Sequence, residues 1–351
     1  MCGIFAYIQQ GKFSTKDLKM INEYFARIKH RGPDYTSTVT LEKFDCSIFL
    51  GFHRLAIIGI PPKNNPLLVD KDVYLVCNGE IYNYKYLIEK YQLQVQTDSD
   101  CEVILQLYKQ YKQLWPAVLE ELDGVFAFVL YDHNTGVIFI SRDRIGVRPL
   151  FEGSTRQAIA FASEGKAIPL PTAKPYTPGT FRVLDLNMDR WWVSISQSSW
   201  LKPGPHLNVP YNTAQSVIRE LFTEAVRKRL VSDRPIGFLV SGGLDSSLVA
   251  AVAHRLLGKQ ITTFSIGLPG SPDLLAARQV ATHLQSDHHE VVISTDDILE
   301  ALPKVVYHDE TYDITTIRAS IPMYLLSKYI AMHTDIKVIF SGEGADELLG
   351  G

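Results

Sequence analysis

The 351-residue sequence lacks the features of a secreted or membrane-spanning protein. It has only four cysteines, at positions 2, 46, 77 and 101, with no Cys-x-x-Cys pair, and no apolar run reaches eighteen residues. These absences exclude a disulfide framework and a transmembrane helix. The N-terminus has no basic segment followed by an apolar stretch, so no secretory signal is expected. We therefore expect a cytoplasmic protein that contacts no membrane.

An excess of positive charge is missing as well. The chain has 35 Lys and Arg against 38 Asp and Glu, which gives a formal net charge of −3. Binding to nucleic-acid phosphates requires a basic surface, so no nucleic-acid partner is expected. Apolar residues make up 46% and charged residues 21%, a balance typical of globular proteins. The length suggests two domains, each long enough to bury a core.

Short β-type runs dominate the first half of the chain. They are separated by Gly, Pro and Asn, and two amphipathic helices are predicted among them, over residues 17–30 and 99–111. Many strands with helices set apart from them indicate an α+β layered domain over residues 1–190. The predicted strands are CGIFAYI, CSIFLGF, RLAIIGI, VYLVCNG, GVFAFVLYD and GVIFISRD.

The pattern changes in the second half. Residues 191–212 are rich in Ser, Pro and Asn and are predicted to be a linker. From residue 213 to 351, buried strands alternate with helices, which predicts a doubly wound parallel α/β sheet. In such a sheet the ligand binds beyond the carboxyl ends of the strands. The strands are predicted at 236–240, 261–266, 289–294 and 337–340.

A glycine-rich loop follows the first of these strands, in IGFLVSGGLDSSLVA. Gly242 and Gly243 let backbone N–H groups approach an anion, and Ser246 and Ser247 are suited to cap the next helix. The plain alternative is a strand–helix turn with capping serines. Asp245 favours the phosphate interpretation, because a carboxylate beside bound phosphate requires a Mg²⁺ ion between them.

A second loop of the same kind follows the strand KVIF. It reads SGEGADELLGG, again Ser-Gly followed by carboxylates, here Glu343 and Asp346. Two such loops at strand ends indicate a site for Mg²⁺-pyrophosphate.

The N-terminus begins MCGIF. Removal of Met1 would free the α-amine of Cys2, which titrates near 7.7–8.0 and can act as a base for the adjacent thiol. The alternative is an ordinary strand cysteine.

Four further segments offer partners for this thiol: HRGPD, HRLAI, NGEIYN and SDCE. Arg54 suits a substrate carboxylate, Asp100 suits an ammonium group, and Asn78 with the N–H of Gly79 can donate to an oxyanion. A substrate that carries both a carboxylate and an ammonium group is a free amino acid. A cysteine nucleophile with an oxyanion hole attacks an amide, so the expected amino acid is glutamine. Considered one at a time, these residues also have ordinary explanations: NGE fits a turn, Arg54 a surface arginine and Asp100 a helix cap.

The segments MCGI, HRGPD, NGEIYN and RDRIGVRPL resemble the class II glutamine amidotransferase domain, an N-terminal-nucleophile layered sandwich. The SGGLDS loop resembles that of the pyrophosphate-releasing ATP-binding family, an adenine-nucleotide α-hydrolase-like fold. In this order the two halves resemble the glutamine-dependent asparagine synthetases, as do GLPGSPDLLAAR, ETYDITTIRAS and VIFSGEGADE. The resemblance implies a ligase in which aspartate, glutamine and ATP give asparagine, glutamate, AMP and pyrophosphate.

The resemblance also implies roles for individual residues. Cys2 attacks the glutamine amide, Asn78 and Gly79 assist it, and Glu343 is the acid implicated in forming β-aspartyl-AMP and accepting ammonia. The implied glutamine-binding residues are Arg54, Asn78, Gly79, Glu80 and Asp100. The implied ATP-binding residues are Leu239, Ser241, Gly242, Gly243, Asp245, Ser246, Ile266, Ser341 and Gly342, with Leu239 and Ile266 on the adenine. Asp245 and Asp346 are implied to hold Mg²⁺.

One departure limits this expectation. The chain ends at Gly351, directly after the second loop, whereas members of the family continue into a helical segment with further aspartate- and pyrophosphate-binding residues. Two alternatives therefore stay open: a related ATP-dependent amidotransferase with another carboxylate acceptor, and a truncated relative that is non-catalytic or only a glutaminase. A homodimer is also left open.

Overall fold

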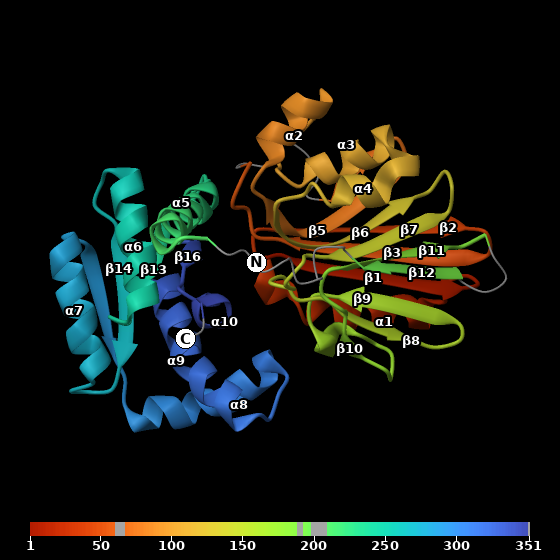
Figure 1. Cartoon of the computed structure of the whole chain (residues 1–351). Coiled ribbons are helices and arrows are strands. Elements are labelled where there is room, and N and C mark those ends of the chain that lie inside the picture. The colour runs from red at the N-terminus through yellow and green to blue at the C-terminus, as the bar shows by residue number, and fades with distance from the viewer. Residues whose placement is uncertain (60–66, 188–191, 198–208, 350–351) are drawn as a thin grey trace. The chain divides into compact units, whose positions relative to one another are not determined.

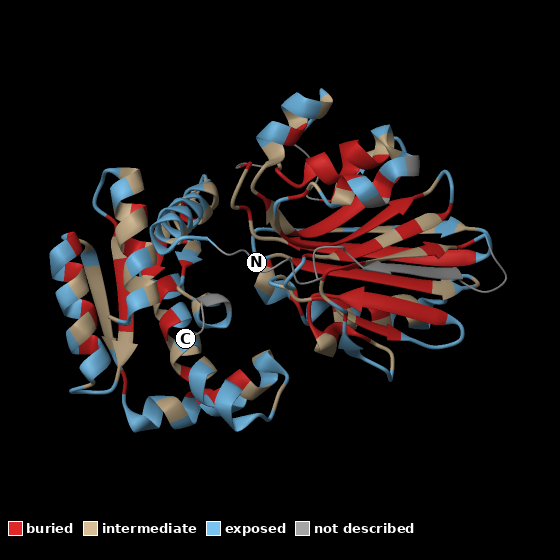
Figure 2. Ribbon diagram, in the orientation of Figure 1, coloured by how far each residue is buried: buried red, intermediate tan, exposed pale blue. Residues whose placement is uncertain are grey.

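The structure, a computed structural model, describes residues 1–59, 67–187, 192–197 and 209–349. The chain divides into two compact units, Met1–Leu207 and Asn208–Gly351. Each unit has its own sheets, helices and buried core (Figures 1 and 2).

The first unit contains two six-stranded sheets, in which all neighbouring strands are antiparallel. One sheet has the order β10 (Lys174–Pro175), β8 (Phe151–Ser154), β9 (Ala158–Ala162), β1 (Gly3–Gln10), β3 (Cys46–Arg54) and β2 (Tyr35–Lys43). The other has the order β12 (Trp192–Gln197), β11 (Thr180–Asp185), β7 (Val137–Arg142), β6 (Gly124–Asp132), β5 (Val73–Ile81) and β4 (Leu68–Asp70).

Helices cover the outer faces of these two sheets (Figure 1). The α-helices are α1 (Thr15–Ala26), α2 (Tyr84–Tyr91), α3 (Glu102–Gln110) and α4 (Trp115–Leu119). The short 3₁₀ helices are η1 (Lys29–Arg31), η2 (Lys112–Leu114) and η3 (Gly165–Ala167).

Strand β1 explains how this arrangement follows from the sequence. Successive side chains of a strand point to opposite faces. Ile4, Ala6 and Ile8 therefore lie in the core between the two sheets, whereas Phe5 and Tyr7 pack on the other face against α1. Both faces are covered, so the strand is apolar throughout these positions. The predicted α+β layered sandwich is confirmed, with the layers in the order helix, sheet, sheet, helix.

One predicted strand, RLAIIGI at 54–60, is wrong for its described part. Strand β3 ends at Arg54, and residues 55–59 form no strand. The Arg54 guanidinium donates to the carbonyl oxygens of Ile58 at 2.8 Å and Gly59 at 3.3 Å, so the segment curls around this side chain. Gly59 has a φ of +77°, which favours glycine and ends any strand. Residue 60 lies outside the described residues.

The predicted linker, 191–212, also differs from the structure where it is described. Residues 192–197 form β12, which pairs with the free edge of β11 in the register Thr180↔Gln197. The next helix begins at Tyr211. Pairing a sheet edge satisfies backbone hydrogen bonds, a gain that composition alone does not reveal. Much of the linker, at 191 and 198–208, lies outside the described residues.

The second unit is a four-stranded parallel sheet in the order β15, β14, β13, β16. Phe238 and Val240 pack on one face with the helices α5, α6 and α7, and Phe264 packs on the other face with α9. The predicted doubly wound sheet is therefore confirmed. Its strands are β13 (Ile236–Leu239), β14 (Thr262–Gly267), β15 (Asp287–Val292) and β16 (Val338–Phe340). Its helices are α5 (Tyr211–Arg229), α6 (Leu244–Leu257), α7 (Pro272–Leu284), α8 (Thr295–Asp309), α9 (Ile314–His333) and α10 (Ala345–Leu349).

The helices in the described part of the chain are all too short or too polar to cross a membrane.

Gly32 allows the turn after η1 to approach β3. A Cβ atom at this position would lie 2.1 Å from the His53 carbonyl oxygen and 2.5 Å from the Arg54 nitrogen. We expect Gly32→Ala to lower the free energy of unfolding by about 3 kcal/mol, because backbone atoms must move apart. The control Gly11→Ala meets no atom within 4 Å and has only its φ of +77° to oppose it, so it should cost about 1 kcal/mol. Denaturant unfolding of both variants measures the difference, and equal losses would contradict the close approach.

Candidate active site

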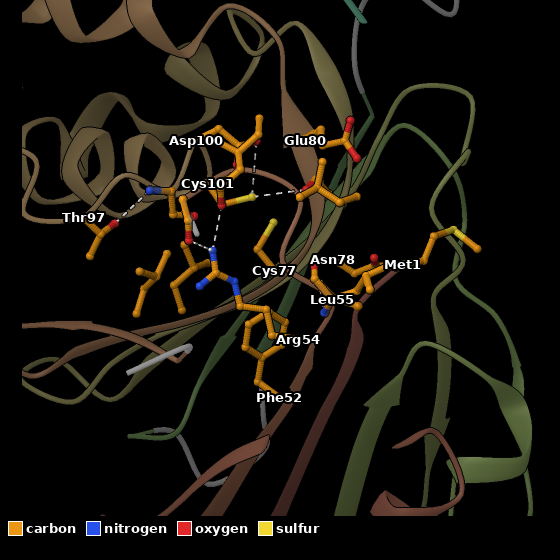
Figure 3. A pocket seen from close by; sticks show the side chains of 18 of the residues that line it. Met1, Phe52, Arg54, Leu55, Cys77, Asn78, Glu80, Thr97, Asp100 and Cys101 are labelled. Atoms are coloured by element: carbon orange, nitrogen blue, oxygen red, sulfur yellow. Dashed lines mark hydrogen bonds between the residues drawn. The ribbon is translucent and has the colours of Figure 1, made fainter. Parts of the chain in front are cut away.

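A pocket opens in the first unit between the ends of the two sheets, close to the N-terminus (Figure 3). It comprises about 800 Å³, part of it open to solvent. Every residue predicted for glutamine hydrolysis in this unit lines it. These are Cys2, Arg54, Asn78, Gly79, Glu80 and Asp100.

Cys2 lies directly before β1, where the sheet register brings it beside the end of β3. Gly3 pairs with His53, so the next residues along β3 adjoin Cys2. The Leu55 N–H donates to the Cys2 sulfur at 3.4 Å, and that thiol lies 3.6 Å from the Leu55 carbonyl oxygen. Burial raises the pKa of the Cys2 thiol, although the N-terminal ammonium opposes this. The thiol therefore needs a nearby base to become a nucleophile at neutral pH.

Asn78 is the most informative polar group in the pocket. The residue is 1% exposed, and its side-chain Nδ2 has no hydrogen-bond partner among the described residues. A buried amide without a partner costs about 1–3 kcal/mol, so such a group indicates a missing ligand. Gly79 follows it in β5, where a Cβ atom would lie 2.6 Å from the Val125 carbonyl oxygen. The tight fit between β5 and β6 keeps both residues in place.

Asp100 and Arg54 supply the two opposite charges of the pocket. Asp100 is 5% exposed, and its Oδ2 accepts from the Ile81 N–H at 2.7 Å. Burial raises the pKa of Asp100 to about 6, against the lowering effect of that hydrogen bond. Asp100 does not cap α3, whose N-cap residue is Cys101. The Arg54 guanidinium is oriented by the carbonyl oxygens of Ile58 and Gly59.

Glu80 is paired with Arg148, a pocket residue to which our sequence analysis assigns no role. Arg148 Nη2 donates to Glu80 Oε1 at 3.0 Å. The loop that carries Arg148 is organised by Asp143, whose carboxylate accepts five backbone N–H groups at 2.7–3.2 Å. The motif RDRIGVRPL contains both residues, but its letters alone do not reveal which side chain enters the pocket.

Arg31 is a second residue near Cys2 to which our sequence analysis assigns no role. Its Nε donates to the Cys2 carbonyl oxygen at 3.0 Å. Arg31 belongs to the segment HRGPD, so this motif could have indicated that the residue lies at the site. The contact itself depends on η1 folding back against the start of β1.

The second unit brings the two predicted phosphate loops together. Its strand order turns at β13, with β14 on one side and β16 on the other. Ser241 follows β13 and Ser341 follows β16, so both loops lie at the switch point where doubly wound sheets bind ligands. A Cβ atom on Gly342 would lie 2.8 Å from the Ser246 nitrogen and 2.9 Å from the Asp245 carbonyl carbon. The second loop thus touches the first at the start of α6.

The first loop has the geometry of an anion cradle. The N-cap of α6 is Gly243, without a side-chain cap, so the prediction that Ser246 or Ser247 caps this helix is wrong. Ser247 instead donates to the Gly243 carbonyl oxygen at 2.6 Å. The Ser246 and Ser241 hydroxyls lie 3.1 Å apart. Gly242 has a φ of +85°, and a Cβ atom there would lie 2.3 Å from the Cβ of Ala276.

Leu239 and Ile266 lie near the carboxyl ends of β13 and β14. Both side chains are half-buried and pack against the cluster around Phe264. The side chains of Glu343 and Asp346 are exposed on the second loop, and Asp245 is half-buried on the first.

A metal site formed by protein alone is not found in the described part of the chain, where no three His, Cys, Asp or Glu side chains group suitably. Mg²⁺ is commonly held by one or two carboxylates together with substrate phosphates. The half-buried Asp245, beside a helix N-terminus that lacks a side-chain cap, fits such a shared site.

Family models match both units. Residues 1–178 match the model described as "Glutamine amidotransferase domain", which defines the class of the first unit. Residues 217–351 match the model described as "Asparagine synthase".

Relatives of the whole chain carry one description. The asparagine synthetase [glutamine-hydrolyzing] of Gallus gallus is 43% identical and aligns with 100% of this chain and 66% of its own length. The Homo sapiens protein of the same description is 41% identical, with the same coverage. A probable asparagine synthetase [glutamine-hydrolyzing] of Acanthamoeba polyphaga mimivirus is 40% identical, covering 100% and 67%. A solved glutamine phosphoribosylpyrophosphate amidotransferase from B. subtilis is 16% identical, with a TM-score of 0.45 and coverage of 82% and 81%.

The chain therefore belongs to the family of glutamine-hydrolysing asparagine synthetases. It spans 66% of the length of the Gallus gallus relative.

Asp143 offers a test of how the pocket is built. In Asp143→Asn, an NH₂ group replaces an oxygen that accepts backbone N–H groups, so donors face a donor. We expect the free energy of unfolding to fall by about 2–3 kcal/mol, because hydrogen bonds to a charged group are lost in a buried loop. Denaturant unfolding measures this loss. Asp185→Asn is the control, since its carboxylate accepts the backbone N–H of Asn187, and a comparable loss there would contradict the central role of Asp143.

Proposed function

We propose that the first unit hydrolyses glutamine and that Cys2, once Met1 is removed, is its nucleophile. The observation that carries this proposal is Asn78 Nδ2, which is buried in the pocket that Cys2 lines and has no partner among the residues that the structure describes. A donor held in this way is suited to an oxyanion that exists only during the reaction.

The chemistry follows from the groups at hand. The α-amine of Cys2 takes the thiol proton, and the thiolate attacks the amide carbon of glutamine. The resulting oxyanion accepts hydrogen bonds from Asn78 Nδ2 and the Gly79 N–H. Collapse of this intermediate breaks the C–N bond, and the amine returns the proton to the leaving ammonia. Water then hydrolyses the Cys2 thioester to glutamate.

The pocket electrostatics support the amine as the base. Burial lowers the pKa of the Met1 amine to about 6, and the nearby charges of Arg31 and Arg148 act in the same direction. The same burial and the same two arginines act on the Cys2 amine once Met1 is removed, so we expect its pKa to be lowered as well and the neutral amine to accept a proton near pH 7.

Arg54 and Asp100 select the substrate. Arg54 pairs with the glutamine α-carboxylate, and Asp100 pairs with the α-ammonium group. Glu80, held by Arg148, adds a second anion on the ammonium side. These two opposite charges require a free amino acid, since a glutamine within a peptide chain has neither terminal charge.

We propose that the second unit binds ATP at its two loops and cleaves it to AMP and pyrophosphate. Ser241, Gly242, Gly243 and Ser246 hold the phosphates with Ser341 and Gly342, while Leu239 and Ile266 contact the adenine. The close approach of Gly342 to Asp245 supports a shared site. Mg²⁺, held by Asp245 and Asp346, would neutralise charge on the departing pyrophosphate.

The two units together make the chain a glutamine-hydrolysing asparagine synthase. Aspartate is activated as β-aspartyl-AMP, and ammonia from the first unit displaces AMP, with Glu343 near the reacting groups. The overall reaction converts aspartate, glutamine, ATP and water to asparagine, glutamate, AMP and pyrophosphate.

The test supplies the chain with ATP, Mg²⁺, aspartate and glutamine carrying ¹⁵N in its side-chain amide. Glutamate, pyrophosphate and ¹⁵N-asparagine are measured separately. We expect Cys2→Ala to reduce glutamate formation by more than about 1000-fold, because the nucleophile is lost. Intact mass should show Met1 absent from the active protein.

Each product tests one part of the proposal. Cys46→Ala is the control thiol, because Cys46 lies in the core between the sheets, and its variant should keep glutaminase activity. Glutamate without pyrophosphate restricts the function to glutamine hydrolysis. Pyrophosphate that depends on a different acceptor overturns aspartate as the substrate.

The raised pKa of Asp100 predicts a pH dependence. Below pH 6 this carboxyl is protonated and loses its attraction for the glutamine ammonium, so we expect KM for glutamine to rise as the pH falls. A single group with a pKa of about 6 gives a rise of about tenfold between pH 7 and pH 5. Asp100→Asn should have a high KM that does not change over this range. Steady-state kinetics decide, and a KM for the unaltered chain that is constant from pH 5 to 7 contradicts the role of Asp100.

A further inference from the structure

Glu164 is a buried carboxylate beside the N-terminus that neither the sequence nor the proposed chemistry explains. It follows β9 and is 7% exposed. An arginine, a lysine and a histidine contact it. Arg31 Nη1 and His30 Nε2 lie 2.9 and 3.0 Å from its Oε1, and Lys166 Nζ lies 2.7 Å from its Oε2. Burial on its own would raise the pKa of Glu164, but hydrogen bonds from these three groups lower it to about 2. The carboxylate is therefore ionised wherever the protein is folded.

Arg31 links this carboxylate to Cys2. One end of its guanidinium, Nη1, binds Glu164, while Nε donates to the Cys2 carbonyl oxygen at 3.0 Å. The side chain of Arg31 is only 8% exposed. A planar guanidinium with both ends bound has little freedom to turn.

The Cys2 carbonyl matters because an N-terminal nucleophile is attached to the protein by a single peptide bond. Removal of Met1 leaves this carbonyl in place. With the carbonyl held by Arg31 and the sulfur held by the Leu55 N–H at 3.4 Å, rotation about both the Cα–C and the Cα–Cβ bond of Cys2 is restricted, and rotation about Cα–Cβ sets the position of the thiol relative to the α-amine. The direction of the α-amine toward the thiol is then determined.

Ser163, the residue before Glu164, holds strand β1 at Ile4, two residues after Cys2. The Ile4 N–H donates to Ser163 Oγ at 2.9 Å, and the Ser163 N–H donates to the Ile4 carbonyl oxygen at 3.0 Å. Ser163 and Glu164 together therefore hold β1 at two successive points next to the nucleophile.

We propose that Glu164 is a positioning residue for Cys2, acting through Arg31 to fix the carbonyl group and so the relative placement of the α-amine and thiol. This inference rests on the proposed function of Cys2 as nucleophile. Glu164 touches no substrate and is not itself a catalytic residue.

The matched variants are Glu164→Gln and Lys166→Met. Glu164→Gln removes the carboxylate charge and so weakens the hold on Arg31. Lys166→Met removes one ion pair of the same carboxylate and leaves the contact with Arg31 in place. We expect Glu164→Gln to lower kcat for glutamine hydrolysis by about 10- to 100-fold, with KM little changed, because misplacement of a reacting group by about 1 Å has this effect. Lys166→Met should keep a kcat close to that of the unaltered chain.

Arg31→Lys provides a second variant, in case Glu164→Gln folds poorly. Lysine keeps the charge beside Glu164 but cannot bind the carboxylate and the Cys2 carbonyl with one rigid fork. We expect its thermal midpoint to stay near that of the unaltered chain while its kcat falls. If kcat and the thermal midpoint fall in parallel in all three variants, Glu164 is only a structural ion-pair partner and the inference is overturned.

Alkylation of Cys2 by iodoacetamide gives a readout that needs no turnover. The Cys2→Ala variant supplies the background from the other three thiols. We expect Glu164→Gln to slow alkylation of Cys2 by about tenfold, because the amine no longer faces the thiol. If the unaltered chain hydrolyses no glutamine yet shows this difference, the proposed function fails and the positioning role stands. If it hydrolyses glutamine and Glu164→Gln reacts and turns over at the same rate, the positioning role alone fails.

Discussion

The register of β1 between β3 and β9 is the constraint on which the first unit depends. Gly3 pairs with His53, and Phe5 pairs with Ala162. A slip of one residue would turn every side chain of β1 to the opposite face. It would move Ile4 out of the core between the sheets and carry Cys2 away from Leu55. The packing that stabilises the unit and the geometry that positions its candidate nucleophile are therefore the same interaction.

The pocket collects its polar groups from segments that are distant along the chain. Strand β1 brings Cys2, β3 ends at Arg54, β5 carries Asn78, and the segment before α3 carries Asp100. Antiparallel strands can deliver such groups to one end of a sandwich because each strand ends where its neighbour begins. The second unit uses a different solution, since its parallel strands all end at one edge and each is followed by a loop.

Much of the fold was predictable because its signals are local. The apolar β-type run of CGIFAYI and the apolar strand before Ser241 need no distant partner to be recognised. The failures had non-local causes. RLAIIGI reads as a strand, but the Arg54 side chain draws its backbone into a curve. Residues 192–197 read as linker, but β11 offered an unpaired edge. Helix α6 begins at Leu244 with Gly243 as its N-cap, and the expected serine cap is not formed because those hydroxyls bond elsewhere.

The sequence by itself determined the chemical inventory: a cysteine behind Met1, an arginine and an aspartate for a free amino acid, and two Ser-Gly loops at strand ends. Only the tertiary structure decided which of these groups meet and which polar atoms are left without partners. Within the described residues Asn78 Nδ2 has no hydrogen-bond partner, and Arg31 joins the Cys2 carbonyl to the buried Glu164. The physical reason is that burial and hydrogen-bond partnership depend on contacts between residues distant in the sequence, such as Arg31 and Glu164, and no local pattern records them.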